Sequence, residues 1–190
     1  MRTSFTVLSA AALLTLAGCS AAAPSTTTAA STSSNDVVRE LGFAGENAKQ
    51  IVQAIDSSPD ARPLAYMASV KEGQLLLTKD GRQASLPLPA DSFYLSIAPY
   101  LTQTHDCYYH SLATCKGELS QQAVTVTITE DSGKVLVNEQ TKTYSNGFVG
   151  FWLPRDIKGT VTVKHENHTG TADFATMPDS ATCLTTLKLT

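Results

Sequence analysis

The spacing of apolar residues changes along the chain, from a helical period near the N-terminus to alternation further on. Between Glu46 and Ser57 the apolar residues recur at i, i+3, i+4 and i+7, at Ala48, Ile51, Val52 and Ile55. This spacing predicts an amphipathic helix. A shorter helix is expected from Asp36, as its N-cap, to Leu41. These two helices are too small to fold alone, so the apolar stripe must pack on the rest of the chain or on a second copy of it.

Helical periodicity is absent from Leu64 onward, and short strands are expected instead. Apolar and polar residues alternate most clearly from Val124 to Ile128, and Asp-Gly, Ser-Gly and Asn-Gly pairs mark turns between several segments. Strands are predicted at residues 74–78, 83–88, 93–97, 124–128, 134–138, 148–153, 160–164, 168–175 and 182–189. This regular spacing is typical of an antiparallel sandwich or barrel. We therefore expect a mainly β (α+β) protein, with a small N-terminal helical and hairpin region at 36–92 and an antiparallel β-sandwich-like domain at 93–190.

The first residues predict export and a lipid anchor. Arg2 precedes an apolar run, Phe5 to Ala17, that is too short to span a bilayer. The run ends in Leu-Ala-Gly-Cys19, which resembles the lipobox of bacterial lipoproteins; the alternative is an ordinary secretory signal followed by a stray cysteine. We expect a lipoprotein signal peptide at 1–18, lipidation of Cys19, and a disordered tether at 19–35, where Ala, Ser and Thr cannot bury enough apolar surface to fold. The protein would then be extracytoplasmic and anchored to the bacterial cell membrane.

Charge and motifs exclude several functions. Removal of the leader with Arg2 leaves 13 basic and 17 acidic residues, a formal charge of −4, and no basic patch. Nucleic acid is therefore not an expected partner. The sequence holds no G-x-S-x-G elbow, phosphate-binding loop, dinucleotide fingerprint or H-E-x-x-H motif, and we assign no catalytic residue. His165 and His168 are interpreted as part of an exposed polar hairpin.

The residues with the most reactive side chains lie close together. His105, Cys107, His110 and Cys115 fall within eleven residues. With Cys183 and a lipidated Cys19, the mature chain has an odd number of thiols, so at least one is free, bound to a ligand or joined to another molecule. Cys107 and Cys115 could share a disulfide or a metal ion if their segment folds back. Cys183 is expected to point inward, either as a buried core thiol or as a ligand.

Clustered thiolates and imidazoles favour a soft metal ion. Cu(I) accepts two or three such ligands, whereas zinc needs four, which the three cysteines and one histidine could supply. Residue type leaves both metals open. A cysteine pair releases electrons as it oxidises, so arriving Cu(II) could be reduced and then held as Cu(I). His105 and His110 could receive Cu(II) first, because imidazole suits both oxidation states.

Four stretches of the sequence carry a resemblance to a known family: Ile97–Tyr100, His105–Leu119 with its C-x7-C pair, Gly147–Asp156 and Thr182–Leu189. Together they resemble the CueP family of bacterial extracytoplasmic copper-binding proteins of copper resistance. The resemblance implies that Cys107, Cys115 and Cys183 bind copper, with His110 and His105 nearby. It also implies a two-domain, dimeric protein that stores or reduces copper. Implied partners are copper acceptors such as a copper-zinc superoxide dismutase, and thiol-disulfide proteins. The predicted anchor at Cys19 departs from soluble, periplasmic relatives.

Two other hypotheses belong to different classes. In one, the protein is a thiol-disulfide redox lipoprotein in which Cys107 and Cys115 cycle and metal is incidental, although the chain lacks the C-x-x-C motif of such enzymes. In the other, it is a structural envelope sandwich with one disulfide and a buried cysteine. Ease of reduction separates these two, because a cycling pair reduces readily and a structural disulfide resists.

Overall fold

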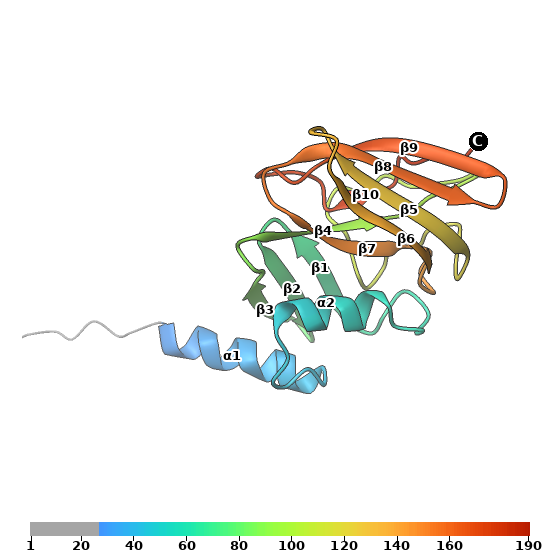
Figure 1. Ribbon diagram of the computed structural model, residues 1–190. Coiled ribbons are helices and arrows are strands. Elements are labelled where there is room, and N and C mark those ends of the chain that lie inside the picture. Colours follow the sequence, from blue (N-terminus) through green and yellow to red (C-terminus); the bar gives the residue numbers. More distant parts are fainter. Residues whose placement is uncertain (1–26) are drawn as a thin grey trace, which may run out of the picture.

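The computed structural model describes residues 27–190, which form two helices and ten strands (Figure 1). The predicted signal peptide, Cys19 and the first part of the tether lie outside the described residues. The elements in chain order are α1 (Thr27–Glu40), α2 (Ala48–Asp56), β1 (Met67–Lys71), β2 (Gln74–Lys79), β3 (Arg82–Pro87), β4 (Ser92–Ile97), β5 (Ala123–Glu130), β6 (Val135–Lys142), β7 (Val149–Pro154), β8 (Lys158–His165), β9 (His168–Ala175) and β10 (Cys183–Leu184). The mainly β prediction with N-terminal helices is confirmed.

Helix α1 begins earlier than predicted. The expected start at Asp36 is wrong, because α1 starts at Thr27 and includes residues 27–35, which were assigned to the tether. Asp36 does not cap the helix but lies inside it, where its carboxylate accepts a hydrogen bond from Arg39 at 2.6 Å. Val37 is buried in the core of the N-terminal region, so the C-terminal half of α1 is held by packing.

Helix α2 forms as its stripe predicts. Asn47 caps it, and the side chains of Asn47 and Gln50 each bond the backbone N–H of the other in a capping box. The apolar stripe packs within the chain, on a three-stranded antiparallel sheet of order β1-β2-β3, and forms one hydrophobic core with it. Strand β1 was not predicted, because only Ala68 and Val70 of its five residues are buried and apolar.

The remaining strands form the predicted sandwich. A sheet of order β10-β4-β7 faces a sheet of order β6-β5-β8-β9, and buried apolar side chains from both sheets make a second core. One pairing departs from the antiparallel expectation: β10 runs parallel to β4, and only Cys183 and Leu184 of the predicted strand 182–189 are paired in it. Leu187 and Leu189 are nevertheless buried, so the segment keeps alternating contacts without a continuous ladder.

The long connection between β4 and β5 carries the cysteine- and histidine-rich loop and lies where the two cores meet. Leu112 and Ala113 belong to the core of the helices and the small sheet. The backbone of the loop is also bonded to that region, since the carbonyl of His110 accepts from the N–H of Val70 at 2.9 Å. Cys115 instead packs in a separate small cluster with Ala98, Phe148 and Cys183. The candidate site is thus built at the junction of the N-terminal region and the sandwich.

Candidate metal centre

Four predicted site residues converge at this junction. The ligand atoms of Cys107, His110, Cys115 and Cys183 all lie within 4.8 Å of one another. Three of the four are buried and Cys107 is half-buried. Three sulfur atoms and one imidazole in so small a volume form a donor set suited to a soft metal ion.

The disulfide differs from the one considered in the sequence analysis, which would have joined Cys107 to Cys115. A disulfide joins Cys107 to Cys183, with Cα atoms 5.7 Å apart, and Cys115 is the free cysteine of the described chain. The Sγ of Cys115 lies 3.5 Å from that of Cys107. Backbone bonds explain the pairing, because the N–H groups of Thr182 and Cys183 both donate to the carbonyl of Tyr108 and bring the end of the chain onto the loop. Of the three cysteines in the described part of the chain, Cys115 is the one left unpaired.

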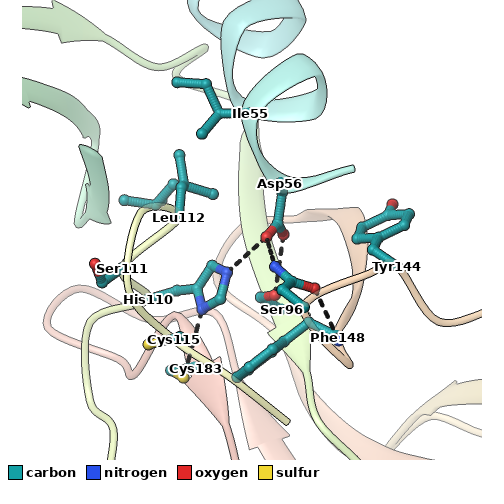
Figure 2. Close-up of polar contacts among 12 residues, drawn as sticks. Ile55, Asp56, Ser96, His110, Ser111, Leu112, Cys115, Tyr144, Phe148 and Cys183 are labelled. Carbon is teal, nitrogen blue, oxygen red and sulfur yellow. Dashed lines mark hydrogen bonds and ion pairs between the residues drawn. The ribbon is translucent and has the colours of Figure 1, made fainter. Parts of the chain in front are cut away.

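His110 connects the sulfur atoms to a buried carboxylate (Figure 2). Its ring is fully buried and packs on Phe148, with ring centroids 4.5 Å apart. Its Nδ1 lies 3.7 Å from the Sγ of Cys183, and its Nε2 lies 2.9 Å from the Oδ1 of Asp56. The two ring nitrogens therefore face different partners, sulfur on one side and carboxylate on the other.

Asp56 is a residue of the candidate site that the sequence analysis did not identify. It is fully buried at the last position of α2 and accepts hydrogen bonds from four side chains. Oδ1 accepts from His110 Nε2 and from Asn146 Nδ2 at 2.7 Å; Oδ2 accepts from the hydroxyls of Tyr94 at 2.6 Å and Ser96 at 3.2 Å. A signal was present, because Asp56 stands four residues after Val52, on the buried stripe of the helix, where a carboxylate needs partners.

Asp56 and His110 shift each other's protonation. Burial alone raises the pKa of Asp56, but the charge and hydrogen bond of His110, with the Tyr94 and Asn146 bonds, outweigh it and lower the pKa below its ordinary value. Burial lowers the pKa of His110, but the Asp56 charge and hydrogen bond, with a smaller contribution from Cys115, raise it to about 9. In the metal-free protein the pair is therefore a carboxylate and an imidazolium at neutral pH.

His105, the fifth predicted ligand, lies outside the group of four. Its ring meets Phe148 edge-on, with centroids 6.1 Å apart, and its Nε2 is buried without a hydrogen-bond partner in the described chain. His105 lines an open pocket of about 670 Å³ together with Cys107 and Cys115. The structure thus places His105 beside two of the thiols, at the same pocket but outside the group of four.

The other histidine pair is separate from this centre. His165 and His168 face each other across the β8–β9 hairpin, as predicted. The expectation of exposure is wrong for His165, which is buried and whose Nδ1 donates to the carbonyl of Ala123 at 2.9 Å. Neither histidine belongs to the cysteine group.

Comparisons with known proteins point to one family. The family profile described as "Periplasmic copper-binding protein CueP" matches residues 50–188. Among solved structures, the crystal structure of S.CueP is 42% identical, covers 82% of this chain and 96% of its own, and superposes with a TM-score of 0.80. No curated protein matches the chain. Among the residues that the structure describes, no helix is both long and apolar enough to cross a membrane.

Proposed function

The chain belongs to the CueP family of periplasmic copper-binding proteins, and from this premise we propose that it traps Cu(I) on Cys107, Cys115 and Cys183. His110 is the fourth donor. The observation that carries the proposal is the convergence of these four ligand atoms within 4.8 Å. We further propose that this trapping serves copper resistance in the bacterial envelope.

The donor set supports Cu(I) over zinc. Soft thiolates select Cu(I), which is satisfied by two or three of them, so the three cysteines suffice and His110 completes or stabilises the site. Zinc would need all four groups in a tetrahedron. Zinc binding is accordingly proposed as the weaker alternative.

The disulfide indicates how the same residues could reduce copper. If the thiolates of Cys107 and Cys183 form the S–S bond, they release two electrons, and two Cu(II) ions each take one to become Cu(I). Cys115 stays a thiol and remains available to hold copper. His105, at the pocket, is proposed to receive Cu(II) first. Regeneration of the dithiol needs two electrons from a thiol-disulfide protein, which we propose as a partner.

The remaining parts of the proposal concern location and partners. We propose that Cys19 carries a lipid that anchors the protein to the cell membrane, that the chain forms a homodimer, and that it passes copper to an envelope acceptor such as a copper-zinc superoxide dismutase. Replacement Cys19→Ala should move the protein from the membrane to the soluble fraction. Continued recovery with membranes would refute the anchor.

The first experiment is an anaerobic competition titration of reduced residues 20–190 with Cu(I) against a chromophoric chelator, with zinc in parallel. The wild type should retain one equivalent of Cu(I) and hold zinc much less tightly. Cys→Ser replacement at position 107, 115 or 183 should weaken retention strongly. His168→Ala is the matched control, because that imidazole lies outside the cysteine group. Full retention in Cys183→Ser would reduce the site to two cysteines, and no retention by the wild type would refute the proposal.

A second candidate function, thiol-disulfide exchange, is favoured by the position of Cys115. Its sulfur lies 3.5 Å from Cys107, one of the two disulfide sulfurs, so a Cys115 thiolate could attack Cys107 and release Cys183. This replaces the expected cycle between Cys107 and Cys115 alone. Mass-spectrometric mapping of the disulfides would test it: exchange predicts both Cys107–Cys183 and Cys107–Cys115 pairings, whereas Cys107–Cys183 alone would count against exchange.

A further inference from the structure

The end of α2 is fastened to the cysteine- and histidine-rich loop by two buried side chains. Asp56 bonds His110, as described above. Arg62, which is 5% exposed, donates from Nε to the carbonyl of Leu112 at 2.8 Å and from Nη2 to the carbonyl of Ile55 at 2.6 Å. The guanidinium thus links the last turn of the helix to the loop, and the Asp56 carboxylate stands at a fixed place beside His110 (Figure 2).

The hydrogen bond between His110 and Asp56 determines which ring nitrogen of His110 can bind a metal ion beside the sulfur atoms. An ionised carboxylate only accepts hydrogen bonds, so the 2.9 Å contact requires a hydrogen on Nε2 of His110. The nitrogen that can give up its proton to a metal ion is then Nδ1, which faces Cys183 at 3.7 Å. Histidines that bind metals commonly donate their other N–H to a carboxylate, which fixes the ring and its tautomer.

Burial of Asp56 is itself informative. A carboxylate without exposure is costly unless its oxygens are satisfied, and here two hydroxyls and an amide, from Tyr94, Ser96 and Asn146, complete the set with His110. An apolar residue would continue the α2 stripe without such a network. The sandwich therefore supplies three further side chains that hold one helix carboxylate against one imidazole.

We propose that Asp56 is a positioning residue of the metal centre, which holds His110 by its Nε2–H and so presents Nδ1 to the three sulfur atoms. Its effect on copper rests on the proposed function, but the orientation of His110 does not, since the contact exists without metal. The helix of the N-terminal region thus contributes to a site whose candidate ligands all lie in the sandwich part of the chain.

The orientation can be tested directly by nitrogen NMR of ¹⁵N-histidine-labelled residues 20–190, reduced, with and without Cu(I). His110 is assigned from the signals lost in His110→Ala. Nε2 should carry a slowly exchanging proton in both samples, and Cu(I) should shift the Nδ1 resonance. In the Cu(I) sample, a proton on Nδ1 together with a metal-shifted Nε2 would overturn the proposal.

A double-mutant cycle measures whether Asp56 acts through His110. Asp56→Ala should weaken Cu(I) retention by roughly 10- to 100-fold, the usual loss for removal of a residue that orients a ligand. In the His110→Ala background the same change should cost almost nothing further. Asn47→Ala, which removes the α2 cap, destabilises the same helix away from the centre and should leave retention unchanged.

The outcomes separate this proposal from the copper proposal. Equal losses from Asp56→Ala in both backgrounds would show an effect independent of His110 and would overturn positioning while leaving the copper site intact. No Cu(I) retention by the wild type would instead refute the copper function. The metal-free NMR spectrum recorded above about pH 9, where the ring is neutral, would still show whether Nε2 keeps its proton, and a proton on Nδ1 there would overturn positioning.

Discussion

The Asp56–His110 pair predicts a specific loss of folding stability at alkaline pH. The pKa of His110 rises from an ordinary value of 6.5 to about 9 in the folded protein, because the Asp56 carboxylate outweighs the burial that opposes it. A group with a raised folded pKa contributes stability that is fully present below its unfolded pKa and is lost as pH rises through the folded one. The difference of about 2.5 between the unfolded and folded pKa of His110 corresponds to about 3 kcal/mol of unfolding free energy. This stability is lost between roughly pH 6.5 and 9.

The assay is urea unfolding of the metal-free protein with the Cys107–Cys183 disulfide intact, from pH 6 to 9.5. Other groups contribute to the pH dependence of both proteins, so the decisive quantity is the difference between the wild type and His110→Gln. In the wild type Asp56 stays ionised across this range, because His110 and the hydrogen bonds from Tyr94 and Asn146 lower its pKa. The wild type should lose about 3 kcal/mol more than the variant across this window. Parallel curves would refute the reasoning, because they would show that His110 is not held charged by Asp56.

Three further predictions concern the frame of the site. Gly150→Ala should destabilise the fold by at least about 1–3 kcal/mol, seen as a lower Tm, because its Cβ would lie 1.8 Å from the Tyr94 hydroxyl oxygen. Arg62→Met should cost on the order of 3 kcal/mol in urea unfolding and speed hydrogen exchange in the loop, since it leaves the Leu112 carbonyl without its donor and removes a hydrogen bond to the Ile55 carbonyl. Glu118→Gln should lower the free energy of unfolding at neutral pH by at most about 1 kcal/mol. The Thr102 hydroxyl and neighbouring N–H groups lower the Glu118 pKa to about 2, so this stability is present above pH 4.5 and disappears as pH falls through 2 in acid unfolding.

The sequence predicted those elements whose pattern is local. Helix α2 and strand β5 each have a clear period, with an apolar residue on every turn or every second position. The start of α1 was less predictable, because it was inferred from one residue. Asp36 was assigned as the N-cap, whereas its carboxylate bonds Arg39 within the same helix. The C-terminal segment shows a different limit, because alternating burial persists there beyond the two residues that pair with β4.

The composition of the site was predictable, but its connections were not. Residue type identified the three cysteines and His110 as donors for a soft ion, and these are the residues that converge. The disulfide joins Cys107 to a residue 76 positions away, and Asp56 bonds His110 across 54 positions. Spacing along the chain carries no information about such contacts, since they depend on how α2 and β10 pack on the loop.

Packing also determines the chemistry that residue type leaves open. From the sequence alone, either of the two ring nitrogens of His110 could face a metal ion. In the folded chain α2 places a carboxylate on the Nε2 side, while the bonds from Thr182 and Cys183 to the loop place sulfur on the Nδ1 side. These two packing contacts come from opposite ends of the described chain. The electronic properties of the centre therefore depend on the joint between the N-terminal region and the sandwich, and a change that loosens this joint should alter metal binding even where every candidate ligand is kept.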